Sequence, residues 1–273
     1  MLIAQITDLH IRLPGQKAYR VVETDRYLPP AVRRLNAMHP RPDLVLVSGD
    51  LTDFGRPAEY AHLKQMLDQL AMPYYVMPGN HDSRSTLREV FVGHDYLGSA
   101  DGFLHFTVDT GPVRIIALDT TVPEQSHGEL CDVRLAWLAA RLAEAPTIPT
   151  LVAMHHPPFD TGIAHMDAIG LRQGRDALDT LLRGYSHIER VICGHVHRTV
   201  FTRFGGTVAS ICPGVAHQVA LDLTAAGPSA FTLEPPGFHV HRWDGRQLVT
   251  HVAAIDVFAG PYPFHENGVL IDE

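Results

Sequence analysis

An α/β fold is predicted for most of this chain by three observations. Short buried strands alternate with amphipathic helices as far as residue 198, which is the order expected of an α/β core. Residues 199–255 read instead as several short strands with Gly and Pro turns, and they predict a second sheet or a lid. Polar side chains follow five of the predicted strands, at the position where open α/β sheets bind their ligands.

The first half of the chain shows these elements in order. Residues 2–7 form a strand that runs into a charge, and residues 11–27 form a polar, irregular loop long enough to cross a site. Pro29 starts a helix that we expect to extend to about residue 38. The apolar run at 44–47 predicts a second buried strand. A helix with one core-facing stripe follows Pro57, and a third strand is expected at 74–77.

The second half continues the alternation before its character changes. Residues 103–108 and 113–118 predict a hairpin, and residues 130–143 predict a strong helix. Buried strands are expected at 151–154 and 188–192, with a helix near 174–183 between them. The tail, 256–273, is rich in Gly, Pro and aromatic residues. The change of composition near residue 199 is the internal sign of a boundary.

Bulk properties narrow the class of protein. The 273 residues are 45% hydrophobic with a mean hydropathy near zero, which suits one large globular domain or one domain with an appendage. No apolar run approaches the ~20 residues of a membrane span, and the N-terminus lacks the basic start of a signal peptide. Three cysteines without ligand spacing indicate thiols in a reducing cytoplasm. A net charge of -8 argues against general nucleic-acid binding, whereas 18 histidines invite a search for metal ligands.

The polar groups at the strand ends are the candidate site. Side chains two apart in a strand point the same way, so each Asp-x-His or His-x-His pair can hold one atom together. A single pair of this kind is more often structural than metal-binding. Five such strand ends in one chain are hard to explain by coincidence. In chain order they carry Asp8 and His10, then Asp50, then Asn80 and His81, then His156, and finally His195 and His197.

The ligand count favours two metal ions that share Asp50. The first predicted set is Asp8, His10, Asp50 and His197, and the second is Asp50, Asn80, His156 and His195. Mixed oxygen and nitrogen ligands without thiolate suit Mn, Fe, Co or Zn, and the spacing does not choose among them. The positive charge of two divalent ions exceeds the negative charge of the two carboxylates, so the site attracts an anionic ester. Coordination lowers the pKa of water toward ~7, which provides a hydroxide nucleophile at neutral pH.

His81 is not needed as a ligand in this scheme. It can hydrogen-bond a phosphate or protonate the leaving alkoxide, which makes it a candidate for both substrate binding and catalysis. The alternative is that His81 contacts neither metal nor substrate and instead orients the ligand Asp8 or Asp50.

The motifs together resemble a known family. Asp8-x-His10, Gly49-Asp50, Gly79-Asn80-His81-Asp82, His155-His156 and Gly194-His195-x-His197 resemble, in order and complete, the five blocks of the calcineurin-like metallophosphoesterase superfamily. The chain looks closest to the branch that holds the bacterial glycerophosphodiesterases and cyclic-nucleotide phosphodiesterases. Further similar segments begin at Gly55, Met166, Pro213 and Ala259, and the likeness is thin at 85–125 and 222–250.

The resemblance implies an architecture and additional roles. It implies a four-layer α/β/β/α sandwich whose catalytic domain comprises residues 1–198 and 256–273. Residues 199–255 are then a small β-rich cap that narrows the site and mediates dimerisation, so we expect a homodimer or a higher homo-oligomer. By the same likeness His217 reaches the substrate from the cap side; a hydrogen-bonded histidine in a turn is the alternative.

These observations lead to a dinuclear-metal phosphodiesterase that acts on small diesters. Metal-bound hydroxide attacks phosphorus, Asp50 bridges the ions, and Asn80, His81 and His217 contact the substrate. Glycerophosphodiesters, with broad specificity, are the expected substrates, and 3′,5′-cyclic nucleotides are the alternative. Two further readings are a nuclease, which the acidic balance disfavours, and a non-catalytic scaffold, which the complete ligand set disfavours.

Overall fold

Two β-sheets lie face to face in the computed structural model, which describes residues 1–98, 102–109 and 111–271. The first sheet has the order β15 (Leu248–Ala254), β14 (Gly237–Trp243), β1 (Leu2–Ile6), β2 (Leu44–Ser48) and β3 (Tyr74–Met77). The second has the order β10 (Val200–Phe204), β11 (Thr207–Ile211), β9 (Ile188–Cys193), β7 (Thr150–Met154), β5 (Arg114–Leu118) and β4 (Phe106–Val108).

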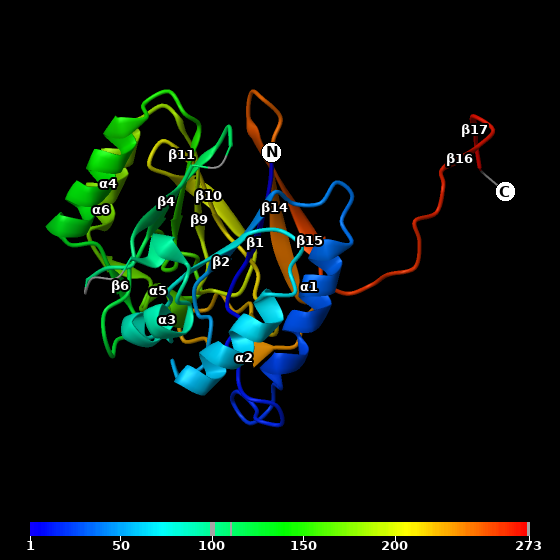
Figure 1. Cartoon of the computed structure of the whole chain (residues 1–273), viewed down its shortest axis with the longest axis horizontal. Coiled ribbons are helices and arrows are strands. Elements are labelled where there is room, and N and C mark those ends of the chain that lie inside the picture. The colour runs from blue at the N-terminus through cyan, green and yellow to red at the C-terminus, as the bar shows by residue number, and fades with distance from the viewer. Residues whose placement is uncertain (99–101, 110, 272–273) are drawn as a thin grey trace.

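Helices cover the outer face of each sheet, as Figure 1 shows. The first sheet carries α1 (Leu28–Asn36), α2 (Pro57–Leu67) and α3 (Arg84–Val90), whose apolar residues share one core with it. The second carries α4 (Asp132–Glu144), α5 (Ala164–Asp167) and α6 (Arg175–Arg183) in the same way. The predicted four-layer α/β/β/α order is confirmed. Within the described residues, no helix has the length and apolar character needed to cross a bilayer.

Strand alternation explains why this sandwich forms. In β2 the side chains of Leu44 and Leu46 enter the core between the two sheets, whereas Val45 and Val47 enter the core beneath the helices. Both faces of the strand are therefore apolar, as expected for a parallel strand that is covered on both sides. The remaining elements are small and lie outside the two large sheets. They are β6 (Gly128–Glu129) with β8 (Leu171–Gln173), β12 (Gln218–Val219) with β13 (Phe231–Thr232), β16 (His265–Glu266) with β17 (Val269–Leu270), and 3-10 turns at Thr24–Arg26 and Asp95–Leu97.

The expected cap at 199–255 does not coincide with a structural division. Strands β10 and β11 extend the second sheet, and β14 and β15 extend the first, so the longest stretch of 199–255 outside both sheets is 212–236, with the β12–β13 hairpin. One face of β14 buries His239 and His241. The other face of β14 places Phe238 and Val240 in the core beneath the helices. Both faces of this strand are therefore buried, although one of them carries polar side chains.

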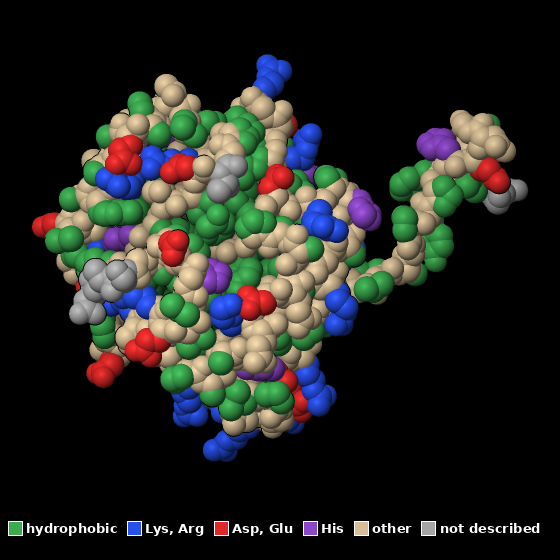
Figure 2. Space-filling view, viewed as in Figure 1, with side chains coloured by type: hydrophobic (Ala, Val, Ile, Leu, Met, Phe, Trp, Pro, Cys, Tyr) green, Lys and Arg blue, Asp and Glu red, His purple; other side chains and the backbone are tan. Residues whose placement is uncertain are grey.

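The C-terminal tail extends beyond the two sheets. From residue 256 the chain leads away from the sandwich and ends in the β16–β17 hairpin, which Figure 1 shows apart from the body. Residues 272 and 273 of the predicted segment lie outside the described residues. The tail exposes large apolar side chains, among them Val257 (93% exposed), Phe264 (81%) and Tyr262 (74%). Figure 2 shows this apolar surface along the tail.

Candidate functional site

The carboxyl ends of the parallel strands in both sheets meet at one edge of the sandwich. β1, β2 and β3 run parallel in the first sheet, and β7 and β9 run parallel in the second. Each of these five strands is followed by polar residues, and the structure brings all of these residues into one region. They are Asp8, His10, Asp50, Asn80, His81, His156, His195 and His197.

The first predicted ligand set forms a compact buried cluster. Asp8, His10, Asp50 and His197 each offer one ligand atom, and these atoms lie within 4.8 Å of one another. The Nε2 atoms of His10 and His197 are 3.2 Å apart, and Asp50 Oδ2 is 3.5 Å from His10 Nε2. Asp8 Oδ1 lies 3.4 Å from His197 Nε2.

In the second predicted set, His156 and His195 form a group with His155, whose ligand atoms lie within 4.8 Å of one another. His195 Nδ1 lies 3.0 Å from Asn80 Oδ1, and the rings of His156 and His195 are 4.7 Å apart. His156 Nδ1 contacts the hydroxyl of Thr120 at 2.7 Å, and its Nε2 is 3.2 Å from the carbonyl oxygen of Ser126. His195 Nε2 is buried and has no hydrogen-bond partner among residues 1–98, 102–109 and 111–271.

The backbone, rather than strand pleating, makes these side chains converge. β1 ends at Ile6 and β9 at Cys193, so the Asp-x-His and His-x-His pairs lie beyond the strands. Left-handed φ angles occur at five of the predicted ligands, where non-glycine residues rarely adopt them. These are Asp8 (54°), His10 (45°), Asp50 (47°), His195 (74°) and His197 (53°). Strained backbone of this kind is concentrated at functional sites in proteins, so its clustering here supports a functional role.

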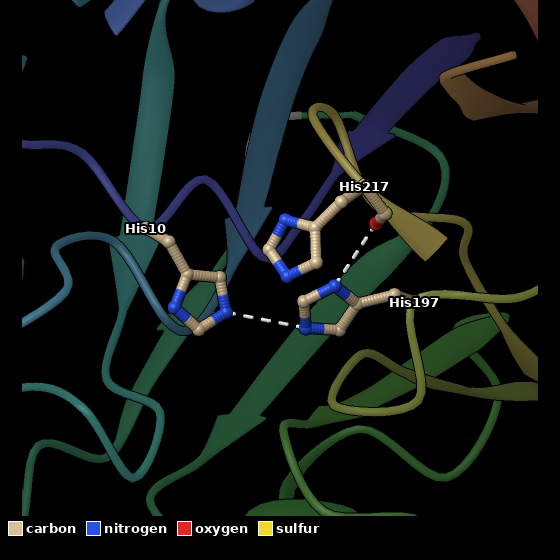
Figure 3. A group of neighbouring side chains, drawn as sticks. All are labelled: His10, His197 and His217. Carbon is tan, nitrogen blue, oxygen red and sulfur yellow. Dashed lines mark hydrogen bonds between the residues drawn. The ribbon is translucent and has the colours of Figure 1, made fainter. Parts of the chain in front are cut away.

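Hydrogen bonds from the surrounding backbone hold several rings in a defined tautomer. His197 Nδ1 donates to the carbonyl oxygen of His217 at 3.0 Å, so its Nε2 lone pair faces His10 (Figure 3). His81 Nδ1 likewise donates to the carbonyl oxygen of Asp53 at 2.9 Å, which leaves its Nε2 for the cavity. The outer partner of a metal-binding histidine acts in this way, since it fixes the ring and exposes one lone pair.

Burial sets the charge of the cluster. It lowers the pKa of His197 to about 3, helped by the neighbouring His10, so this ring is neutral and can act as a ligand. Burial also raises the pKa of Asp8 to about 6, and the nearby Asp50 adds to this shift, although His155 opposes it. Burial acts on Asp50 in the same direction, but His155 and His81 outweigh it and hold the pKa of Asp50 well below its usual range.

The donor set fits metal ions. Several atoms with lone pairs face one another in a buried space, which is unfavourable unless a cation or protons lie between them. His10 Nδ1 and His195 Nε2 are buried without a hydrogen-bond partner in the described part of the chain. Carboxylate and imidazole ligands are the ones that divalent transition metals take in proteins. The residues present therefore fit two metal ions.

A cavity of about 480 Å³ opens beside this cluster. His10, Asp50, Asn80 and His81 line its floor, together with His195, His197 and His217. The loop at 11–27 contributes Tyr19, and the β12–β13 hairpin contributes Phe231; their rings lie 5.3 Å apart and both contact His217. Sequence analysis expected the loop to cross the site but did not single out these two aromatic residues, which carry no motif signal.

His155 is a third residue to which the sequence analysis gave no role. It appears in the His155-His156 motif, in which only His156 is a predicted ligand. In the structure its ring is fully buried, and Nε2 lies 3.3 Å from Asp50 Oδ1 and 4.0 Å from Asp8 Oδ1. The glycines at 49 and 79 were a usable signal, since a side chain at either position would overlap this ring or Asp50.

Comparison with known proteins agrees with this geometry. Residues 1–199 match the family described as calcineurin-like phosphoesterase. The chain belongs to the calcineurin-like phosphoesterase family. The family expected from the five motifs is thus confirmed.

Relatives of this phosphoesterase align over nearly its full length. A probable glycerophosphodiester phosphodiesterase, GpdQ, of Arcobacter nitrofigilis is 38% identical and covers 100% of both chains. A probable cyclic nucleotide phosphodiesterase of Rhodopseudomonas palustris is 34% identical over 99% of this chain and 98% of its own. Among solved structures, a dimetal phosphatase from Danio rerio has a TM-score of 0.70 at 17% identity, covering 93% of this chain and 96% of that one, which supports the fold.

Replacement of Gly79 by Ala will damage the metal site more than the fold. The added methyl group would overlap the Asp50 carboxylate and lie 2.8 Å from His155 Nε2. We expect the affinity for Mn²⁺ to fall about tenfold or more, measured by titration of metal-free protein. The control is Gly184→Ala, whose methyl group would meet one carbonyl oxygen at 3.2 Å, far from the site. Equal affinities in the two variants would contradict this account.

Metal binding will weaken as the pH falls from 8 to 5. Asp8 must be ionised to bind, and its pKa is raised to about 6 by burial. The pKa of His10 is also raised, because Asp53 and Asp50 outweigh the effect of burial, so protons compete there as well. Below pH 6 the affinity for Mn²⁺ should fall by roughly tenfold per pH unit, measured by competition with a chelator of known affinity. Circular dichroism at each pH controls for unfolding, and a constant affinity would show that these groups do not bind the metal.

Proposed function

We propose that this phosphoesterase hydrolyses small phosphodiesters, with glycerophosphodiesters as the first candidates, in a reaction that depends on two divalent metal ions. The observation that carries the proposal is the buried carboxylate and imidazole cluster at the floor of a 480 Å³ cavity. Two curated relatives named glycerophosphodiester phosphodiesterase, at 38% and 33% identity over nearly the whole chain, support the substrate class.

The ions are assigned to the two ligand sets. Asp8, His10, Asp50 and His197 would hold one ion, and Asp50, Asn80, His156 and His195 would hold the other. Mn, Fe, Co and Zn all suit these oxygen and nitrogen ligands. Bound in this way, such ions neutralise phosphate charge and make a water molecule nucleophilic at neutral pH.

His81 is assigned to the leaving group. Its ring is 30% exposed, lines the cavity and lies 4.6 Å from the ring of His10. Its Nδ1 contacts Asp53 rather than Asp8 or Asp50, which favours catalysis over the orienting role considered as the alternative. Its Nε2 can then hydrogen-bond the phosphate or give a proton to the departing alkoxide.

The cavity selects a small substrate. Asn80 and His217 line the cavity beside the cluster, where both can contact a bound diester. A space of 480 Å³ holds a small molecule rather than a polymer. The face in Figure 2 mixes Lys and Arg with Asp and Glu side chains, and the net charge is -8, so nucleic acid is not the substrate we propose.

A 3′,5′-cyclic nucleotide is the second candidate substrate. Tyr19 and Phe231 place two aromatic rings at the cavity wall, where a base can stack on them. The relative from Rhodopseudomonas palustris, named a probable cyclic nucleotide phosphodiesterase, supports this alternative.

Steady-state kinetics on parallel substrates test the proposal. Mn²⁺-loaded protein is assayed with glycerophosphoethanolamine, cyclic AMP, bis(p-nitrophenyl) phosphate and p-nitrophenyl phosphate. We expect the highest kcat/KM for the glycerol diester and loss of turnover after chelation, with recovery when Mn²⁺ is restored. A higher kcat/KM for cyclic AMP would select the second candidate. Preference for the monoester, or full activity after exhaustive chelation, would refute the diesterase.

The assembly and location are also proposals. We propose a homodimer or higher homo-oligomer, supported by the apolar tail and by the exposed side chains of Phe201 and Val252 on the two edge strands β10 and β15. The narrowing and dimerising role expected of 199–255 belongs to the same proposal. The three free cysteines support a cytoplasmic location. Sedimentation of the full chain against a chain shortened after residue 255 tests the oligomer.

Replacement of His81 by Ala should remove catalysis and leave the metals in place. Loss of an acid catalyst lowers kcat by about 10²–10⁴-fold, because the leaving alkoxide must then depart without a proton. The measurement is kcat together with metal content. The matched control is His251→Ala on the exposed face of β15, which should keep wild-type kcat. A His81→Ala variant with wild-type kcat would return this residue to a structural role.

A further inference from the structure

We infer that Arg198 and Glu234 form a clasp that holds the β12–β13 hairpin against the cavity and thereby sets the affinity for the substituents of the diester. Arg198 directly follows the predicted ligand His197, and Glu234 lies just beyond β13. Both are positioning residues, because they act through the hairpin rather than on the substrate. The inference rests on the proposed diesterase activity and adds to it a device for substrate affinity.

The hairpin is small and needs support from the rest of the molecule. β12 pairs with β13 at two positions, and the backbone N–H of Ala220 donates to the carbonyl oxygen of Ala230 at 2.9 Å. Both strands lie outside the two large sheets. A two-stranded hairpin is at best marginally stable by itself in water, so the place of this hairpin depends on its contacts with the body of the protein.

Arg198 connects the loop of the predicted ligands to both strands of the hairpin. Its Nη1 donates to the carbonyl oxygen of Val219 in β12 at 2.7 Å and to Glu234 Oε1 at 3.1 Å. Its Nη2 lies 2.9 Å from Glu234 Oε2. Thr232 Oγ1 in β13 donates to the same carboxylate at 2.9 Å. The guanidinium therefore holds β12 directly and β13 through a carboxylate that it contacts with two nitrogens, which is the strong and specific form of an ion pair.

The clasp and the cavity lie on opposite faces of β12. His217 and Val219 line the cavity beside the metal cluster. Gln218, between them, lines a separate hollow together with Arg198 and Glu234. This is the alternation expected along a strand, where neighbouring side chains point to opposite faces. The clasp can therefore fix the position of the cavity wall from its outer side.

Phe231 is the part of the wall through which the clasp acts. Its ring lies 5.3 Å from the ring of Tyr19 and 5.3 Å from that of His217, and all three rings line the cavity. Phe231 directly precedes Thr232, whose hydroxyl is bonded to Glu234. Release of the clasp would let Phe231 move out of this aromatic contact. A bound diester would then lose one wall of its cavity, whereas the metal ligands would keep their places.

The test compares Arg198→Met with wild type in the full, Mn²⁺-loaded chain. Methionine keeps an apolar stem and removes the ion pair and the bond to Val219. We expect KM for glycerophosphoethanolamine to rise about fivefold, the scale of a charge-assisted contact that is partly exposed, with kcat and Mn²⁺ affinity within about twofold of wild type. Hydrogen–deuterium exchange of the 212–236 segment should become faster, and this measurement needs no substrate. Arg198→Lys keeps the charge without the two-nitrogen contact, so its KM should lie between the two.

A double variant tests the route through the aromatic wall, and a distant ion pair provides the control. The effects of Arg198→Met and Phe231→Ala on KM should be less than additive, because both remove the same wall. The control is Arg183→Met, which breaks a similar two-nitrogen contact with Asp179 on α6, at 2.7 and 3.2 Å. It should keep the KM and the exchange rate of wild type.

The remaining outcomes would overturn the inference. A wild-type KM in Arg198→Met, or unchanged exchange of the 212–236 segment, would show that the ion pair does not hold the hairpin. A loss of Mn²⁺ affinity equal to the rise in KM would assign Arg198 to the ligand loop instead. Full additivity with Phe231→Ala would refute the route through the wall. Wild-type protein that hydrolyses no diester would refute the proposed function, whereas faster exchange in Arg198→Met would still support the clasp.

Discussion

The site depends on keeping two buried carboxylates, Asp8 and Asp50, beside each other. Each raises the free energy of the other by charge repulsion, and burial removes the water that would solvate them. Backbone hydrogen-bond donors of the protein stabilise the two carboxylates. The backbone N–H of His195 donates to both oxygens of Asp8 at 3.1 and 3.0 Å, and that of His81 donates to Asp50. The remaining deficit of positive charge is what a pair of divalent ions supplies.

This constraint explains why the ligands lie on loops with left-handed backbone. A regular strand end would point alternate side chains to opposite faces and leave its N–H groups in the sheet. At Asp8 and His10 the left-handed φ accompanies a turn in which their backbone N–H groups donate to the carbonyl oxygens of Gly49 and Asp50, at 3.1 and 2.9 Å, so the two ligand loops are tied together. The cost of such angles is of order 1–3 kcal/mol each, and the packed sheets around them must offset it. β1, β2 and β9, buried on both faces over most of their length, provide that support.

Much of the arrangement could be predicted because it is local. The alternation of apolar strands with amphipathic helices predicted the α/β core. The polar residues that follow five of the strands predicted the site in which the structure brings them together. The features that the sequence did not predict depend on contacts between distant parts of the chain. His239 and His241 make β14 look like a surface strand, yet the pairing of β14 with β1 buries both of them. Nothing in the sequence near residue 237 reports that partner.

The site residues that the sequence did not reveal also depend on contacts between distant parts of the chain. Tyr19 and Phe231 lie 212 positions apart and meet only because a loop and a hairpin fold over the cavity. Their contribution is shape, which no short motif encodes. His155 is different, since it lies just beyond the end of β7, where its ring is 5.0 Å from that of His156, and the strand pattern does not say what its far side faces. Here the far side is the loop at Gly49 and Asp50 of the opposing sheet, 105 positions earlier. A sandwich places functional groups on both sides of a strand whenever a second sheet carries part of the site, so strand parity alone cannot dismiss a polar residue.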